Sequence, residues 1–310
     1  MSKHRGRAGA RAITDVVPEL ARRFLMAPDP PLRLPTVREL VHEHRSSLAS
    51  IHAAISRLEA AGAIGLERRG RLGAFLVSRS LGALWAAVEG GPLVVSLPLA
   101  SSLRYEALAT AIKQLLTKAG LEVFLIFVRG SRQRLQAVRE GRCHLAVMSS
   151  FAAAELCGLD DRVVLELGPN SYNTGHRVFY SSTNHHRPMR IIVDRHSADQ
   201  QLLTALEFGG SEVELLPAMT GQITRLLTNG QADAAVWTSD EMEATRLGGI
   251  LDRPLAAPIR ARIGDTDTRA ALVASATEAD LLGALVGHVD PAEVARIQLE
   301  VMSGQLVPEY

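Results

Sequence analysis

The stretch LPTVREL, residues 34–40, predicts the first turns of a helix that carries its own start signal. Thr36 can accept a hydrogen bond from the backbone N–H of Glu39, and the Glu39 side chain can reach back to the N–H of Thr36, which makes a capping box. The apolar residues that follow recur at helical spacing and share one buried face: Val37, Leu40 and Val41.

A second helix is predicted directly after the polar run Arg45-Ser46-Ser47, in which Ser47 is a suitable N-cap. Gly62 suits the left-handed residue just beyond the end of this helix. Its apolar stripe consists of Ile51, Ala54, Ile55 and Leu58. Two helices joined by so short a turn favour a helix-turn-helix.

The next segment predicts a hairpin, with short strands over residues 64–67 and 74–77 around the sequence RRGRLG. The glycines permit a tight reversal, and three arginines lie at its tip. A further helix over residues 13–26 can close the small core. The whole is predicted to be a winged helix-turn-helix; the alternative is a helical bundle with a charged hairpin.

These motifs resemble the winged helix of the GntR family, in the LPT–EL opening, the helix end RLEAAGAI and the wing RRGRLGAFLV. Groove geometry then predicts that the second helix enters the major groove. The side chains predicted to face base edges are Ser47, Ala49, Ser50 and His52. The other predicted DNA contacts are Ser46 and, mostly on phosphates, Arg45, Arg68, Arg69 and Arg71. Related proteins often carry Arg where Leu48 and His52 stand here, so no operator sequence is predicted.

Charge is distributed unevenly along the 310 residues. The net charge is +1 overall, but residues 1–80 have a balance of +7 and the remainder has −6. This asymmetry favours a nucleic-acid module joined to a domain that does not bind polyanions. Two cysteines are too few for a disulfide framework, and no apolar run is long enough to span a bilayer. The expected location is the cytoplasm, with no membrane partner.

The remainder alternates short apolar runs with helical patterns, which favours an α/β fold with mostly parallel sheets. A short helix over residues 80–91 links it to the winged helix, and its apolar stripe can dock on its own domain or form a dimer contact. Residues 121–150 and 211–239 repeat one strand–helix–strand pattern, which indicates two similar lobes. Strands are predicted at 93–97, 123–128, 145–148, 163–167, 190–193, 213–216 and 234–237.

This pattern resembles the type 2 periplasmic-binding-protein fold, two α/β lobes over a cleft. The resemblance implies a winged helix at 1–79, a linker at 80–91 and an effector domain at 92–310. Lobe I would comprise about 92–172 and 265–310, and lobe II about 177–260. A more specific resemblance, to the YhfZ family of regulators, rests on RSS (45–47), ERRGR (67–71), SLPL (96–99), LELGP (165–169) with Tyr172, SADQ (197–200), FGGS (208–211) and the final PEY (308–310).

Ligands of α/β lobes bind beyond the carboxyl ends of strands, where helix N-termini point into the crevice. Hydroxyl groups recur at these positions, and Arg129 and Arg132 could pair with an anion. The predicted effector is therefore small and anionic or hydroxylated. Residues 170–175 are predicted to form a hinge crossing. The candidate effector-binding residues are Ser101, Ser102, Arg129, Ser131, Arg132, Ser149, Ser150, His196, Ser197, Asp199, Thr220 and Thr238.

The favoured function is a ligand-responsive, sequence-specific DNA-binding regulator, working as a homodimer on an operator. One alternative is an enzyme, because the two-lobed fold also houses catalysts, but no acid–base pair stands out in the sequence. Another is a DNA-binding protein whose C-terminal domain assembles partners without a ligand. No catalytic residue, metal site or cofactor is predicted.

Overall fold

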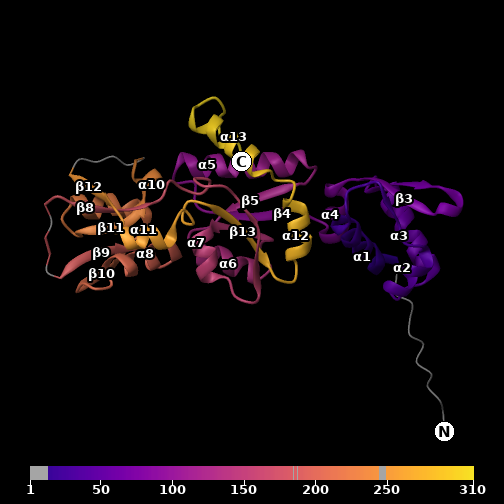
Figure 1. Ribbon diagram of the computed structural model, residues 1–310, viewed down its shortest axis with the longest axis horizontal. Coiled ribbons are helices and arrows are strands. Elements are labelled where there is room, and N and C mark those ends of the chain that lie inside the picture. Colours follow the sequence, from indigo (N-terminus) through magenta and orange to yellow (C-terminus); the bar gives the residue numbers. More distant parts are fainter. Residues whose placement is uncertain (1–12, 184, 187, 244–248) are drawn as a thin grey trace, which may run out of the picture. The chain divides into compact units, whose positions relative to one another are not determined.

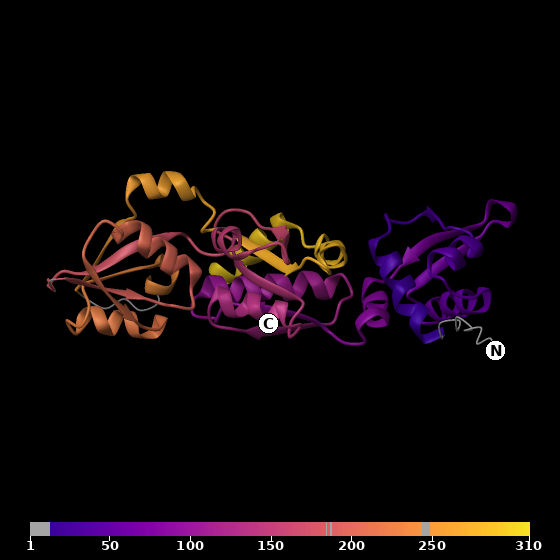
Figure 2. The same cartoon turned by 90° about the horizontal axis from the view of Figure 1, so that it is seen from below.

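The computed structural model describes residues 13–183, 185–186, 188–243 and 249–310, and the chain divides into two compact units. The first ends at Leu93 and also includes Leu116–Val123. The second consists of Val94–Leu115 and Phe124–Tyr310. Figure 1 labels many of the elements of both units, and Figure 2 shows the same chain in a view turned by 90°.

The first unit contains three helices whose ends follow the predicted signals: α1 (Ile13–Met26), α2 (Val37–Glu43) and α3 (Leu48–Ala60). The capping box at Thr36 and Glu39 is present, and Ser47 caps α3 by accepting from the backbone N–H of Ser50. Gly62 has a φ of 67°, as expected for the residue beyond the helix end. The apolar faces bury Leu20, Phe24, Leu40, Ile51 and Leu58.

A small antiparallel sheet completes this unit, in the order β1-β3-β2. Its strands are β1 (Leu32–Arg33), β2 (Ile64–Arg68) and β3 (Ala74–Arg79), and a turn of 3-10 helix at Gly70–Leu72 forms the tip of the wing. The connector helix α4 (Leu81–Glu89) begins at the N-cap Ser80 and packs along α1. Docking on its own domain, one of the two predicted roles of its apolar stripe, is therefore present.

The second unit contains two five-stranded sheets. Sheet I consists of β4 (Leu93–Leu97), β5 (Val123–Phe127), β6 (Leu145–Ser149), β7 (Asp161–Glu166) and β13 (Ala270–Ser275), in the order β5-β4-β6-β13-β7. Its helices are α5 (Leu103–Lys118), α6 (Ser131–Arg139), α7 (Ser150–Leu156), α12 (Ala279–Val286) and α13 (Pro291–Met302). Figure 1 shows α5 and α6 on opposite sides of this sheet.

Sheet II consists of β8 (His176–Ser181), β9 (Met189–Val193), β10 (Val213–Pro217), β11 (Ala234–Thr238) and β12 (Ile250–Pro254), in the order β10-β9-β11-β8-β12. Its helices are α8 (Ala198–Phe208), α9 (Ile223–Thr228), α10 (Ser239–Glu243) and α11 (Ala257–Ile263), with a 3-10 turn at Thr220–Gln222.

The expectation of mostly parallel sheets is wrong, because both sheets are mixed. β4 and β6 pair in parallel, and so do β9 and its two neighbours. β13 runs antiparallel to β6 and β7, and β8 runs antiparallel to β11 and β12. β8 and β13 are the first strands after the chain crosses from one sheet to the other, and each enters its new sheet in the reverse direction. The repeated segments do form matching units, β5-α6-β6 and β10-α9-β11.

The two sheets of this unit share apolar packing through α7 and α8. Phe151 of α7 lies in the core cluster of sheet II with Ile191 and Leu203, whereas Ala198 of α8 lies in the core cluster of sheet I with Met148. The chain crosses between the sheets at residues 167–175, a range that contains the crossing predicted at 170–175, and again at residues 264–269. This exchange of apolar residues fixes the carboxyl ends of the strands of both sheets around one pocket.

Candidate functional site

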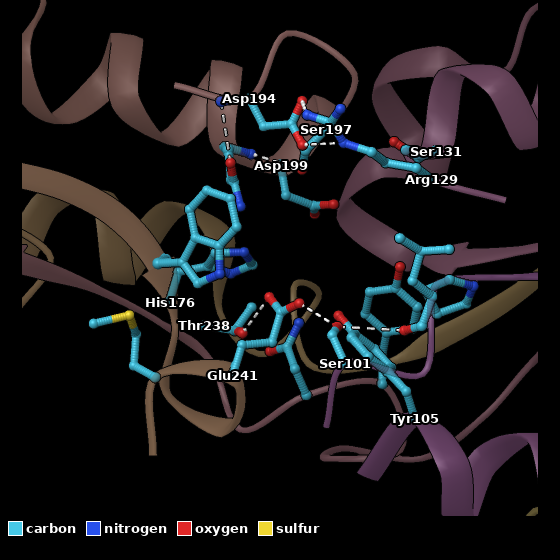
Figure 3. Close-up of a pocket in the computed structure, with 18 of the residues that line it drawn as sticks. Ser101, Tyr105, Arg129, Ser131, His176, Asp194, Ser197, Asp199, Thr238 and Glu241 are labelled. Atoms are coloured by element: carbon cyan, nitrogen blue, oxygen red, sulfur yellow. Dashed lines mark hydrogen bonds and ion pairs between the residues drawn. The ribbon is translucent and has the colours of Figure 1, made fainter. Parts of the chain in front are cut away.

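A pocket of about 300 Å³ lies in the second unit where strands of both sheets end. From sheet I, the segments after β4 and β5 contribute Ser101 and Arg129. From sheet II, the segments after β9 and β11 contribute Ser197 and Glu241, and the crossing at 167–175 contributes Tyr172. Figure 3 shows Ser101, Arg129, Ser197 and Glu241 around an open centre. The position agrees with the rule that ligands of α/β folds bind beyond strand carboxyl ends.

The structure brings half of the candidate effector residues to this pocket. Those that line it are Ser101, Arg129, Ser131, Ser197, Asp199 and Thr238. The Thr220 side chain lies outside the described residues, although its neighbour Gly221 lines the pocket. These residues stand at the end of a strand, shortly after one, or in the first turn of a helix.

Five candidates lie elsewhere, and each has a local reason. Ser102 is buried as a cap of α5, where its Oγ accepts from the N–H of Tyr105, and Ser149 caps α7 by accepting from Ala152. Ser150, the first residue of α7, is buried away from the pocket. Arg132 and His196 are exposed on the protein surface and do not line the cavity. Ser102 and Ser149 thus serve as helix caps.

The two arginines that do face the pocket are already engaged. Arg129 forms an ion pair with Asp194, at 2.7 Å between its Nη2 and a carboxylate oxygen. Arg134 is 2% exposed and donates to the carbonyl oxygens of Val128 and Val147 and to the hydroxyl of Tyr172. The predicted anion-binding pair of Arg129 and Arg132 is therefore not formed, because α6 turns Arg132 to solvent and Arg129 has an acidic partner.

His176 is a buried lining residue that the sequence did not single out. Its Nδ1 lies 2.8 Å from Oδ2 of Asp267, which also accepts from the backbone N–H of His176 at 3.1 Å. Burial disfavours the imidazolium, but the Asp267 carboxylate, helped by Asp199 and Glu241, outweighs it, so the pKa of His176 is raised above its ordinary value. The pair holds the ring in one orientation at the edge of the pocket.

Two carboxyl groups reach toward the centre of the pocket from different sides, as Figure 3 shows for Asp199 and Glu241. Asp199 accepts a hydrogen bond from Ser149, and burial raises its pKa despite the nearby His176. Glu241 accepts from Ser101 at 2.5 Å and from Thr238 at 2.9 Å, and burial raises its pKa as well. Hydroxyl groups thus solvate both acids in place of water.

Asn173, like Trp237, is a buried lining residue with a side-chain nitrogen that has no hydrogen-bond partner within the described structure. Asn173 is 1% exposed, and its Oδ1 accepts from the N–H of Gly175 at 2.7 Å. Its Nδ2 has no hydrogen-bond partner. Because an unsatisfied buried amide is costly, such a donor at the edge of a cavity indicates a group that a ligand can satisfy.

The aromatic residues of the pocket are also buried. Tyr105 and Tyr172 stack edge to face with ring centroids 5.2 Å apart. Burial raises the pKa of Tyr172 to about 12 and that of Tyr105 well above its ordinary value, so both phenols stay neutral. Trp237, at the end of β11, is 1% exposed and lines the same cavity. Together they give the pocket apolar walls between its polar groups.

Sequence reasoning missed Asp194, His176, Asn173, Trp237 and Glu241. Asp194 directly follows β9 and therefore obeys the same strand-end rule that found the serines. His176 and Asn173 lie at the crossing into an unpredicted strand, β8. Glu241 stands one helical turn after Thr238, so extending each strand-end search by one turn finds it.

The second candidate site is the surface of the first unit formed by α3 and the wing. Leu48 is 53% exposed at the start of α3, and Ala49 and His52 are exposed beside it. Ser50 does not face outward as predicted. It is 7% exposed, and its hydroxyl hydrogen-bonds to that of Ser47, because its position lies on the buried side of the first helical turn.

The arginines of this surface are exposed, and two of them have acidic neighbours. Arg68 pairs with Glu59 at 2.7 Å and Arg69 with Glu67 at 2.7 Å. The Arg69 guanidinium also lies 4.4 Å from the centroid of the Phe75 ring. The remaining arginines are exposed at the tip of the wing, Arg71, and before α3, Arg45, which has a φ of 47°. Ser46 is partly buried.

The cysteines and histidines outside these sites carry little chemistry of their own. Burial raises the pKa of Cys143, and it raises that of Cys157 to about 11, so both remain thiols. His186 hydrogen-bonds to Asp233 at the end of sheet II.

Across the described residues, three or more potential metal ligands do not gather at any point. None of the described helices has both the length and the apolar character needed to cross a membrane.

Comparison with known proteins gives two family matches. The family model of the YhfZ C-terminal domain matches residues 81–310, and that of a helix-turn-helix domain matches residues 32–76. The uncharacterized protein YhfZ of Escherichia coli strain K12 is 32% identical over 302 residues, which cover 95% of this chain and 96% of that protein.

Solved structures are similar as well. The crystal structure of YhfZ from Shigella flexneri matches with a TM-score of 0.61 and 28% identity, over 74% of this chain and 97% of that chain. The periplasmic aliphatic sulphonate binding protein SsuA from Escherichia coli matches with a TM-score of 0.50 and 17% identity, over 69% of this chain and 75% of its own. The second likeness shows that the C-terminal unit has the periplasmic-binding-protein fold.

Proposed function

This chain belongs to the YhfZ family, and we propose that it is a sequence-specific DNA-binding transcriptional regulator whose C-terminal unit binds a small-molecule effector. The observation that carries the proposal is that one chain joins a helix-turn-helix with an exposed helix face to a pocket at the strand ends of a binding-protein fold. The helix-turn-helix would bind DNA, and the pocket would bind the ligand that regulates it.

The exposed residues of α3 support base recognition. Ala49 and His52 lie on the outward face of the first turns, where a recognition helix meets base edges. Leu48 adds an exposed apolar side chain that suits contact with a thymine methyl group. The arginines of the wing and of the turn before α3 would neutralise phosphates and so provide affinity rather than sequence choice.

Contacts across the pocket suggest how a ligand would be sensed. Ser101, which follows β4 of sheet I, donates to Glu241, which follows β11 of sheet II. Arg104 of α5 likewise pairs with Asp240 of α10 at 2.9 Å. A ligand that competes for Glu241 changes the balance of these contacts, and a coupling of about 1–3 kcal/mol suffices for a 5–150-fold change in DNA affinity. A homodimer would present two such helices to half-sites about 34 Å apart.

DNA binding is tested with the full-length protein and labelled fragments that flank its own gene, by fluorescence anisotropy with random-sequence DNA as competitor. We expect specific binding that Arg71→Ala and Arg69→Ala weaken about tenfold or more. Arg142→Ala, an exposed arginine of the second unit, is the matched control and should change affinity less than twofold. Binding that is unaffected by both wing substitutions would refute the role assigned to the wing.

The His176–Asp267 pair favours a second candidate, an enzyme, because an aspartate-held histidine beside two acids can transfer protons. The two candidates differ in what becomes of a bound ligand. Incubating each ligand that binds with the protein, and following the mixture by NMR, tests this directly. An unchanged ligand supports the sensor, whereas conversion that is lost in His176→Gln supports the enzyme.

A further inference from the structure

We infer that the pocket binds an uncharged, polyhydroxylated molecule, such as a sugar or a polyol. This inference rests on the proposed function only in taking the pocket to be a ligand site. It narrows the expected effector, which the sequence left as either anionic or hydroxylated, to the second class.

The first step concerns anions. Three carboxyl groups line the pocket, those of Asp194, Asp199 and Glu241. Arg129 is paired with Asp194, and Arg134 donates hydrogen bonds to two carbonyl oxygens and to a phenol. The three lining carboxyl groups therefore outnumber the two lining arginines, and Arg129 already neutralises Asp194. A carboxylate or phosphate placed here would meet like charges instead, which is costly in a buried site.

The second step concerns cations. An ammonium ligand could pair with Asp199 and Glu241, but it carries donors and no acceptor. The buried Nδ2 of Asn173 would then stay unsatisfied, because it needs an acceptor. His176, whose pKa is raised by Asp267 against the effect of burial, and Arg129 would face the same cation. A cation thus satisfies the acceptors of the pocket but not its donor.

A hydroxyl group can satisfy both the acceptors and the donor of the pocket, because it donates one hydrogen bond and accepts others. Asp199 and Glu241 can accept from ligand hydroxyls, as they already accept from Ser149, Ser101 and Thr238. The Nδ2 of Asn173 can donate to a ligand oxygen. A zwitterion also has both kinds of group, but its anionic end would again meet a lining in which carboxyl groups outnumber arginines.

The walls of the pocket suit the carbon skeleton of such a molecule. Trp237 and Tyr105 lie among the polar groups, and Leu99 and Met242 add apolar surface. Aromatic faces pack on C–H groups while polar groups around the rim fix orientation. A volume of about 300 Å³ is at the lower end for ligand pockets, which fits a small molecule.

The test uses the full-length protein and ligands matched in shape but not in charge. Glucitol, gluconate and glucamine share one carbon chain and differ in the terminal group, and corresponding sets can be made from other hexoses and pentoses. Thermal-shift screening followed by calorimetry at pH 7 should find a neutral member that binds below about 1 mM, with its charged counterparts at least tenfold weaker. Tighter binding of a charged member, or no binding by any neutral member, overturns the inference.

Variants tie the binding to this pocket. Asp199→Asn should weaken the neutral ligand about tenfold or more, whereas Asp160→Asn, an exposed aspartate on a loop, should leave its affinity unchanged. Equal affinity in wild type and Asp199→Asn would place the ligand elsewhere and overturn the assignment. A charged ligand that alters DNA affinity would refute this ligand class but keep the regulator. A neutral ligand that binds without changing the affinity for DNA would support this ligand class but contradict the proposed regulation.

Discussion

The wing of the first unit and the pocket of the second both bring arginine and carboxylate together, but in different surroundings. Arg68 and Arg69 are exposed and pair with Glu59 and Glu67 in water. In the pocket, Asp199 is 5% exposed and its neighbours are fixed by packing. Exposed pairs exchange partners at little cost, whereas buried groups are held in place and are costly to leave unpaired.

This difference matches two kinds of ligand. A nucleic acid brings its own dense charge, so a surface that binds it needs cations that can leave their local partners. A small molecule has few groups, so a pocket that selects it needs fixed donors and acceptors. The predictions below test whether the two regions do differ in this way.

The largest effect is expected from the buried arginine behind the pocket. Arg134→Met removes the donors to Val128, Val147 and the Tyr172 hydroxyl and should lower the free energy of unfolding of the second unit by about 3–5 kcal/mol. Urea denaturation followed by Trp237 fluorescence measures it in a Trp85→Phe background, which leaves a single tryptophan.

The matched control for this prediction is Arg132→Met, two residues earlier on the same helix and exposed to solvent. It should change stability by no more than about 0.5 kcal/mol. Equal effects of the two substitutions would mean that burial does not distinguish these arginines, and the contrast between surface and pocket would lose its basis.

The local structure of the first unit could be predicted from the sequence because its signals lie close together along the chain. The capping box at Thr36, the N-cap Ser47 and the left-handed Gly62 each depend on a few neighbouring residues. Ser50 was the exception, since its burial depends on which side of the first turn of α3 packs on the unit. Propensity says that a helix forms there, but not which polar residue turns inward.

The pocket was predictable in place but not in chemistry. Strand ends located Ser101, Ser131, Ser197 and Thr238, because each follows a strand that the sequence reveals. Asn173 and His176 were not predicted because they lie where the chain enters β8. This strand is antiparallel to its neighbours, so its beginning rather than its end lies at the pocket. Pairs such as Arg129 with Asp194 join residues 65 positions apart, and only the packing of both sheets brings them together.

The next largest effect is expected from salt, which should lower the affinity for DNA much more than the affinity for the pocket ligand. Raising the salt concentration from about 50 to 200 mM should weaken DNA binding about 100-fold or more, because each phosphate contact releases counterions. Affinity for the pocket ligand should change less than about twofold. The ligand is uncharged, and the charged side chains of the pocket are buried and paired, so dissolved salt screens them little. Anisotropy and calorimetry on the same preparation measure both. A ligand affinity that falls as steeply as DNA affinity would contradict the assignment of an uncharged ligand.

A smaller effect concerns the stability cost of the buried acid. Burial raises the pKa of Asp199 in the folded protein above its ordinary value of 3.8, so the folded state favours the protonated form. The stability tied to that form is present below pH 3.8 and is lost as pH rises through the raised pKa. Asp199→Asn, which cannot ionise, should therefore be more stable than wild type at pH 7.

The pH dependence is the sharper part of this prediction. The difference in unfolding free energy between Asp199→Asn and wild type should be near zero in acid, should grow above pH 3.8, and should then level off. Urea titrations at a series of pH values measure it, with Asp160→Asn as the exposed control. A variant that is both less stable and unable to bind ligand would show that the carboxylate holds the fold rather than the ligand.

The smallest effect should come from releasing an arginine of the wing. Glu59 pairs with Arg68 and so competes with phosphate for the same guanidinium. Glu59→Gln removes the competing charge and should strengthen DNA binding a few-fold at low salt, with a change in Tm of no more than about 2 °C. Glu155→Gln, an exposed glutamate of the second unit, controls for net charge. If Glu59→Gln weakened DNA binding, the glutamate would be orienting Arg68 for phosphate rather than competing with it, and the wing would then be as preorganised as the pocket.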